Sequence, residues 1–393
     1  MIRTFTVKHF KSIESVDDLE LGQVNVFMGP NAAGKSNLLE AFGVLAAAAN
    51  GRVDDEALLR RGVRPGIPAL FKAAFPDSTA AEIRFCVSTD DASYDVGLFN
   101  PITHPWPAWH FHTEKLTSGN EVLFGRSHHT RKKQHPEAGL AALKLVDLDP
   151  KNPAARLLET LRNFSIYSPN TPTLRGLVPD PQTREPVGLA GGGLPSGVVG
   201  AMNAKRKDQE RVWNEIFEMI SWARNIRVMD AAEAPLSPSV PTSPTVLGFV
   251  DEYMRKGRNT LTGYDASEGA LYVLFTAVLA LHEKAPRMFA IDNADHGLNP
   301  RLARKLTECF CRWILESSNR RQALLTSHNP LVLDALPLQD DRVRLFIVDR
   351  SQQGKSIVNR LIVDENLLAK AKKGWTLSRL WLTGNLGGMP SGI

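Results

Sequence analysis

The clearest chemical feature of the sequence is a phosphate-binding loop, Gly29-Pro30-Asn31-Ala32-Ala33-Gly34-Lys35-Ser36. It matches GxxxxGK[ST] at every fixed position. It lies between an apolar run at 23–28 that predicts a strand and a Leu- and Ala-rich run at 35–49 that predicts a helix. Such a loop wraps a phosphate with backbone N–H groups, its lysine reaches the outer phosphates and its hydroxyl binds Mg²⁺. We expect nucleotide contacts from the following residues: Gly29, Asn31, Ala32, Ala33, Gly34, Lys35, Ser36 and Asn37.

A second Gly354-Lys355-Ser356 lacks the upstream glycine, and its polar surroundings predict an ordinary turn. An acidic residue, Asp292, follows the apolar run Met288-Phe289-Ala290-Ile291. An acid at the end of a buried strand beside the loop helps to hold Mg²⁺, so we expect Ser36 and Asp292 to form the metal site.

Two further motifs have residue types that suit a γ-phosphate. Ser267-Glu268-Gly269 precedes an apolar helix expected at 270–282, whose start offers a hydroxyl and a positive dipole end. A plain helix-capping serine is the simpler interpretation when this motif is taken alone. His328 follows another apolar run and can bond a phosphate or the attacking water.

Together, in this order, these elements resemble the ABC-type ATPase heads of the SMC/RecF/OLD group, including stand-alone ATPases of bacterial anti-phage defence modules. The opening Phe10-Lys11-Ser12-Ile13 resembles the group's N-terminus, Ser-Glu-Gly its short signature motif, and Ser-His-Asn-Pro at 327–330 its switch-histidine loop. The resemblance covers about residues 1–99 and 245–350. It implies ATP and Mg²⁺ as cofactors. It also implies a homodimer or higher oligomer in which Ser267 and Gly269 of one head meet the nucleotide on the other.

The sequence departs from that group at one catalytic position. The group has Glu directly after the Asp of this strand, whereas this chain has Asn293. An amide cannot take a proton from water, and a general base contributes about 10²–10⁴-fold to a rate. We therefore expect slow ATP hydrolysis, with Asp295 and His328 as the candidate substitutes for the missing base.

The elements that must position these residues predict a two-lobed α/β head. Runs at 2–7, 80–88 and 93–99 alternate as strands of a mixed β lobe, and those at 288–291, 322–326 and 344–348 are buried strands separated by helical patterns. A Pro- and His-rich stretch at 100–140 and a Pro- and Gly-rich stretch at 168–200 predict irregular structure. A helix is expected at 208–224, and 235–244 reads as a linker. The expected organisation is an ATPase lobe at 1–99, an irregular and helical insertion at 100–244, and a second ATPase lobe at 245–393.

Composition sets wider limits on the class of protein. The 393 residues are 43% hydrophobic and 23% charged, with a net charge of +5, which excludes a disordered chain and only permits nucleic-acid contact. Three cysteines favour a reducing compartment. The N-terminus lacks a signal-peptide core and no apolar run is long enough to span a bilayer, so we expect a cytoplasmic protein without membrane contact.

Two functional classes stay open at this point. One is a regulatory ATPase that controls a separate effector such as a nuclease or toxin, since the chain has no coiled coil, zinc hook or nuclease motif of its own. Its loops at 100–140 and 168–207 would face the partner. The other is a RecF-like DNA-binding repair protein. Its phosphate contacts would come from two basic runs: Arg131, Lys132, Lys133, Lys205, Arg206 and Lys207.

Overall fold

The computed structural model describes residues 1–76, 78–79, 81–127, 135–240, 243–365, 367, 370 and 374–386. In this part of the chain the strands form two six-stranded sheets, a three-stranded sheet and a two-stranded ribbon. The ribbon joins β4 (Ala74–Phe75) to β5 (Ser78–Thr79).

The first large sheet is antiparallel throughout its described pairings. Its strands, in spatial order, are β2 (Ile13–Glu20), β1 (Thr4–Phe10), β6 (Ile83–Ser88), β7 (Ala92–Phe99), β8 (His110–Ser118) and β9 (Glu121–Arg126). The expectation of irregular structure after residue 99 is wrong for β8 and β9, which continue this sheet. Their alternation is hidden because one inward position of β8 is the acidic Glu114, whose carboxylate accepts bonds from Tyr94 and from the amides of Leu140 and Ala141.

The second large sheet is parallel except at one edge, as expected for the second lobe. Its strands, in spatial order, are β10 (Ile166–Tyr167), β14 (Met288–Ile291), β15 (Gln322–Ser327), β3 (Val24–Met28), β16 (Val343–Arg350) and β17 (Ser356–Arg360). A helix, α10 (Pro300–Leu315), connects β14 to β15. The helix expected between β15 and β16 is wrong for most of this connection, which contains only the 3-10 helix η2 (Pro330–Ala335).

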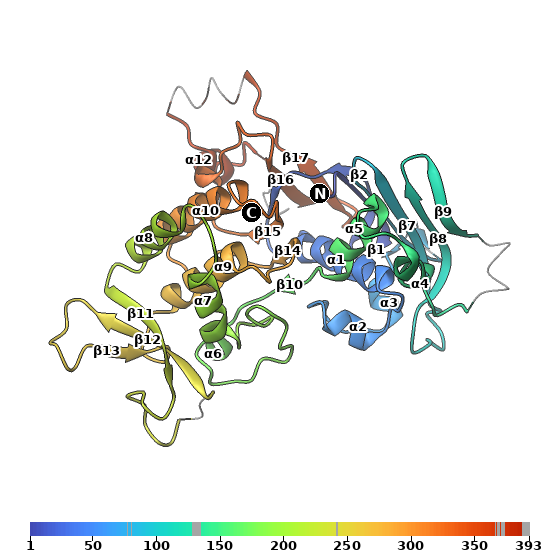
Figure 1. Ribbon diagram of the computed structural model, residues 1–393. Coiled ribbons are helices and arrows are strands. Elements are labelled where there is room, and N and C mark those ends of the chain that lie inside the picture. The colour runs from blue at the N-terminus through green and yellow to red at the C-terminus, as the bar shows by residue number, and fades with distance from the viewer. Residues whose placement is uncertain are drawn as a thin grey trace.

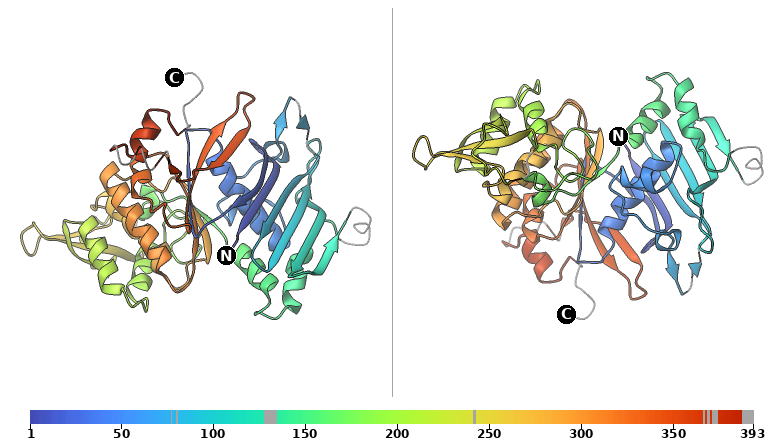
Figure 2. Two further views of the ribbon diagram at one scale, coloured as in Figure 1. Left: turned by 90° about the horizontal axis from the view of Figure 1, so that it is seen from above. Right: turned by 90° about the horizontal axis from the view of Figure 1, so that it is seen from below.

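Side chains on the two faces of this central sheet belong to two separate hydrophobic cores. Phe27 lies in the core shared with the first sheet, where it stacks on Phe346 at 5.0 Å between ring centres. Val26 and Met28 point into the other core. The first core also contains α1 (Lys35–Ala49), α4 (Leu140–Asp147) and α5 (Pro153–Arg162). The second contains α7 (Leu194–Met202), α8 (Gln209–Met219), α9 (Glu268–Leu281) and α10. Figures 1 and 2 show this division on either side of the central sheet.

The remaining elements complete the two sides. The three-stranded sheet consists of β11 (Ala223–Asp230), β12 (Thr245–Asp251) and β13 (Thr260–Thr262), and Figure 1 shows it projecting at one end of the molecule. The helix expected at 208–224 ends at Met219 because β11 begins soon after it. The short helices are α2 (Asp55–Leu59), α3 (Pro68–Phe71), α6 (Thr171–Leu174) and α12 (Leu377–Leu382). The boundaries expected for the two ATPase lobes and the insertion, 1–99, 100–244 and 245–393, stay a prediction. Residues 128–134, which contain the first basic run, lie outside the described residues.

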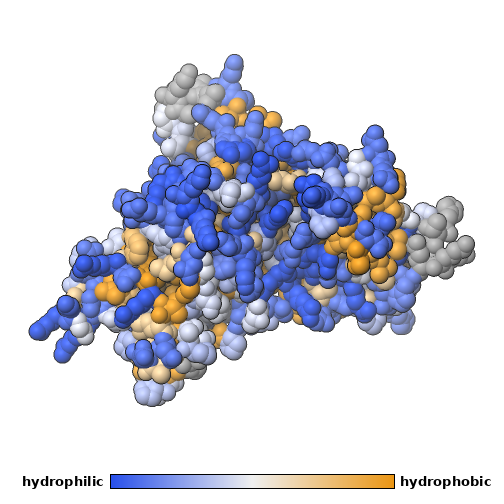
Figure 3. Space-filling model, in the orientation of Figure 1, coloured by the Kyte–Doolittle hydropathy of each residue, from blue (hydrophilic) through white to orange (hydrophobic). Residues whose placement is uncertain are grey.

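The surface seen in Figure 3 is mainly hydrophilic, with a group of apolar residues over the α4–α5 region. On α4, Leu143 and Val146 are 65% and 84% exposed. Among the helices of the described residues, none has the length and apolar character needed to cross a membrane.

Candidate nucleotide-binding site

Three neighbouring parallel strands bring the predicted site residues to one edge of the central sheet. The phosphate-binding loop follows β3, Asp292 follows β14, and His328 follows β15, and these strands lie side by side in the order β14-β15-β3. Carboxyl ends of parallel strands share one edge, where ligands of open α/β sheets bind. Residues far apart in the sequence therefore meet here.

The loop has the backbone geometry of an anion cradle. Ala32 and Gly34 have φ angles of 62° and 111°, in the left-handed region. A Cβ at Gly34 would also lie 2.1 Å from the Ser356 hydroxyl oxygen, so glycine is required there. Gly34 is the N-cap of α1 and caps it with no side chain, which leaves the first N–H groups of the helix available to a phosphate.

Lys35 lies buried beneath the loop, with 4% of its surface exposed. Its Nζ donates to the carbonyl oxygens of Gly29 and Pro30, each at 2.8 Å, and lies 3.3 Å from Nδ1 of His328. Burial lowers the pKa of Lys35 to about 8, against the opposing charges of Asp292 and Asp295. Among the described residues no carboxylate forms an ion pair with Lys35, and a phosphate would provide such an anionic partner for its Nζ.

The expected metal ligands Ser36 and Asp292 are in contact. The Ser36 hydroxyl donates to Oδ1 of Asp292 at 3.1 Å, and the Thr326 hydroxyl donates to the same oxygen at 2.6 Å. A hydroxyl and a carboxylate fit Mg²⁺, which prefers oxygen ligands and usually completes its shell with phosphate oxygens and water. Among the described residues, no cluster of three or more His, Cys, Asp or Glu could hold a metal ion.

Asn293 and His328 contact each other next to this pair. His328 Nε2 lies 3.1 Å from Oδ1 of Asn293, so Nε2 carries the hydrogen and donates it. Asn293 has a left-handed φ of 54°, and its backbone N–H donates to the Thr326 hydroxyl at 2.8 Å. The backbone N–H of His328 lies 3.4 Å from each carboxylate oxygen of Asp295. Burial and the Lys35 charge lower the pKa of His328, so its imidazole is neutral at pH 7.

Sequence reasoning missed a second layer beneath the loop. Arg64 donates from Nε to Glu40 at 2.7 Å and from Nη2 to Asn37 Oδ1 at 3.2 Å. Glu40 is buried and also pairs with Lys11. Thr326, which bridges Asp292 and Asn293, is a further supporting residue of the site. Only Thr326 had a signal, since it directly precedes the Ser-His-Asn-Pro motif.

Ser267 and Gly269 lie at the start of α9, apart from this cluster. Ser267 is the N-cap of that helix, yet its exposed hydroxyl makes no capping bond. Hydrogen bonds of the described residues join Lys35, Ser36, Asp292, Asn293, Asp295 and His328 but do not extend to Ser267 or Gly269. Among the described residues, the Ser-Glu-Gly motif therefore makes no hydrogen bond to the site residues of its own chain.

Solved structures resemble this chain in fold. The SmcHead bound to the C-winged helix domain of ScpA is 13% identical with a TM-score of 0.52, and the match covers 93% of this chain and 99% of that chain. An SMC head domain from Thermotoga maritima is 13% identical with a TM-score of 0.46, covering 92% and 99%. No curated protein matches.

A protein family matches most of the sequence. Residues 24–334 match the family described as "AAA domain, putative AbiEii toxin, Type IV TA system". That range includes the phosphate-binding loop, the Ser-Glu-Gly motif, Asp292 and His328. The chain therefore belongs to this AAA-domain family of AbiEii type and is an AAA-type ATPase with the fold of an SMC-like ATPase head.

Proposed function

We propose that this protein binds ATP, hydrolyses it slowly, and works as an ATP-controlled dimer that regulates a separate effector in bacterial anti-phage defence. The observation that carries this proposal is Asn293, a neutral side chain next to Asp292 at the position where an acidic base is expected. His328 donates to its oxygen at 3.1 Å. The Asn293 amide thus accepts the hydrogen bond from His328 that would otherwise orient a carboxylate acting as the proton acceptor.

Neither candidate substitute replaces the base well in this arrangement. The imidazole of His328 uses its Nε2 hydrogen on Asn293, and its Nδ1 faces Lys35. The Asp295 carboxylate lies at 3.4 Å from the backbone of His328, at the long end of hydrogen-bond distances. A weak base predicts slow turnover, so the ATP-bound state would persist and the protein would act more as a switch than as a motor.

Dimer formation around ATP is supported by the signature motif. The Ser267 hydroxyl is exposed at the start of the 14-residue helix α9 and is not used as a cap. Helix starts attract anions because of their free N–H groups. A second copy of the chain would present its nucleotide to this helix start, and each copy would complete the other's site.

A protein effector is supported by the exposed apolar side chains on α4. Leu143 and Val146 lie directly after the 100–140 segment that we expect to face a partner. The structure of SmcHead with the C-winged helix domain of ScpA is an example of a head with this fold bound to a partner domain. A role in anti-phage defence favours a nuclease or a toxin as the effector.

Steady-state ATP turnover of the purified chain tests the proposal. We expect slow hydrolysis that falls further in Asp295→Ala and His328→Ala. Rapid hydrolysis that survives both substitutions would exclude the switch interpretation.

A second candidate function, ATP-dependent DNA binding of RecF type, rests on a different surface from the one first considered. Arg131, Lys132 and Lys133 lie outside the described residues, and Arg206 pairs with Asp208 at 2.9 Å. The β12–β13 turn is more suitable, because Tyr253 is 79% exposed there. The basic residues of that turn are Arg255, Lys256 and Arg258. A steep loss of duplex affinity with salt, abolished by replacing those three residues, would favour this function.

A further inference from the structure

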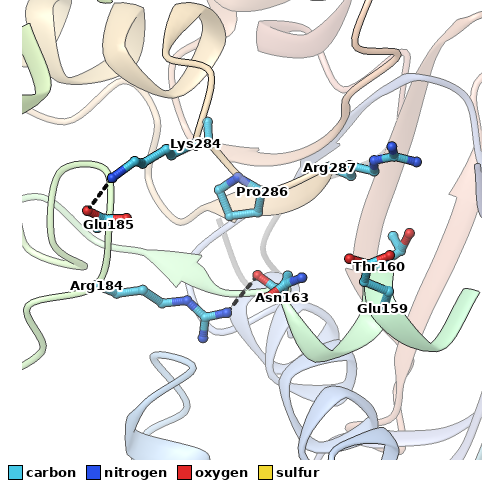
Figure 4. Close-up of a pocket in the computed structure, with 9 residues that line it drawn as sticks. Glu159, Thr160, Asn163, Arg184, Glu185, Lys284, Pro286 and Arg287 are labelled. Atoms are coloured by element: carbon cyan, nitrogen blue, oxygen red, sulfur yellow. Dashed lines mark hydrogen bonds and ion pairs between the residues drawn. The ribbon is translucent and has the colours of Figure 1, made fainter. Parts of the chain in front are cut away.

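Two adjoining cavities lie at the edge of the central sheet opposite the nucleotide site. One has a volume of about 330 Å³ and is lined by the segments ahead of β14 and around the end of α5. The other has a volume of about 300 Å³ and reaches the segments ahead of β1 and β15. They share Thr160 and Arg287 and so form one groove, which we call the amino-edge groove. Figure 4 shows its first half, with Lys284 and Arg287 facing Arg184, Asn163 and Thr160 across the opening.

Cationic groups outnumber carboxylates along this groove. Its basic residues are Arg3, Arg156, Arg184, Lys284, Arg287 and Arg320, and its acidic residues are Asp90, Asp91, Glu159 and Glu185. Two of the cations are already paired, Arg3 with Asp90 and Lys284 with Glu185, each at 2.9 Å. Among the described residues, Arg184 donates to backbone carbonyls alone, including that of Asn163 at 2.9 Å. Within the described part of the chain, Arg287 and Arg320 have no ion-pair partner.

The two unpaired arginines, Arg287 and Arg320, line the same half of the groove. Burial and the positive charges of Arg3, Arg287 and Arg320 lower the pKa of the Met1 amine, against Asp90. Like charges at short range repel one another, and this repulsion is relieved when an anion binds between them.

We propose that the amino-edge groove binds a small phosphate-bearing molecule of nucleotide size. A guanidinium matches two phosphate oxygens at once, and Arg287 and Arg320 are exposed and free to do so. Ala285 and Pro286 provide an apolar wall on one side of Arg287, which suits a ring or a sugar. Each half of the groove lies at the lower end of the ~300–1,000 Å³ range of small-molecule sites, and the joined groove lies well inside it.

The position of the groove connects it to the ATPase site. Arg287 directly precedes β14, which ends at Asp292, and Arg320 lies just before β15, which ends at His328. At about 3.3 Å per residue, Arg287 lies roughly 16 Å from Asp292 along β14, and Arg320 lies roughly 26 Å from His328 along β15. A ligand held by both arginines would fix the two strands relative to each other. Its effect on turnover rests on the proposed function, whereas its binding does not.

Calorimetric titration of the Lys35→Ala chain tests the site, because that change removes phosphate binding at the loop. Pyrophosphate and AMP are the probes, one without and one with a base and sugar. We expect saturable binding that weakens about tenfold or more in Arg287→Ala/Arg320→Ala, since charge-assisted bonds to phosphate are lost. The matched control is Arg224→Ala/Arg227→Ala, which removes two exposed arginines of β11 and should leave the affinity unchanged. Tighter binding of AMP assigns a nucleotide, and tighter binding of pyrophosphate assigns a diphosphate group alone. Absence of saturable binding by both probes, or equal affinity in both double variants, would overturn the proposal.

Discussion

Replacing Asn293 by glutamate should convert this ATPase from slow to fast. The side chain is exposed beside Asp292, and its oxygen already accepts a hydrogen bond from His328 at 3.1 Å. A carboxylate there would accept the same bond and would also be able to take a proton from water. General-base catalysis of about 10²–10⁴-fold corresponds to roughly 2.7–5.4 kcal/mol at the barrier.

The backbone conformation at residue 293 makes the glutamate variant less stable, which partly offsets its higher kcat. Asn293 has a φ of 54°, which asparagine and aspartate tolerate and glutamate tolerates less well. Left-handed backbone costs about 1–2 kcal/mol, and the cost reduces the free energy of unfolding. We therefore expect kcat to rise by about 10²-fold or more, with a lower Tm of a few degrees.

Two matched variants separate charge from length. Asn293→Gln has the length of glutamate without the charge, and it should leave kcat near that of the unaltered chain. Asn293→Asp has the charge without the length, and it should give a smaller rise because its carboxylate reaches less far. Phosphate release under saturating Mg-ATP is the assay. Equal rates for the glutamate and glutamine variants would refute the assignment of a missing base at this position.

Three further predictions follow from the site. Because burial lowers the pKa of Lys35 to about 8 and a bound phosphate would favour its charged form, ATP affinity should be constant at pH 6.5–7.5 and fall about tenfold per unit well above pH 8. Lys35→Arg should remove this dependence in titration calorimetry. Ser267→Arg should abolish the ATP-dependent dimer and leave ATP binding by single chains intact, as measured by sedimentation and nucleotide titration. Glu40→Gln should cost about 1–3 kcal/mol in urea unfolding at pH 7. Burial opposes the charged form of Glu40, but Arg64 and Lys11 outweigh it and lower its pKa, so its contribution is lost as the pH falls below that pKa and the two chains should converge there.

Local patterns were sufficient for the parts of the fold with strong periodicity. The helix expected at 35–49 matches α1, and the buried runs at 288–291, 322–326 and 344–348 lie in β14, β15 and β16. Each is a continuous apolar segment beside a clear break, so its own sequence determines its structure. The strands β8 and β9 were not foreseen, because prolines and histidines surround them and a buried Glu114 interrupts the apolar face.

Contacts between distant residues could not be foreseen from one sequence. Ser356, which belongs to the second Gly-Lys-Ser, was expected in an ordinary turn. In the structure its hydroxyl donates to the Ala33 carbonyl at 2.6 Å and lies 2.7 Å from the Ser12 hydroxyl, so it supports the back of the phosphate loop. Arg64 reaches Asn37 in the same manner, across a turn with no motif of its own. Such pairs depend on the sheet order, which single-residue patterns do not contain.

The mass of the assembly with and without ATP tests the central claim most directly. In Mg-ATP we expect a species of twice the 43.3 kDa chain mass that persists for many minutes, and a single chain in the absence of nucleotide. The same measurement on Lys35→Ala should show no dimer under either condition. An unaltered chain whose mass is the same with and without ATP, or whose dimer disappears within seconds because ATP is consumed, would contradict the account of a slow, ATP-held switch.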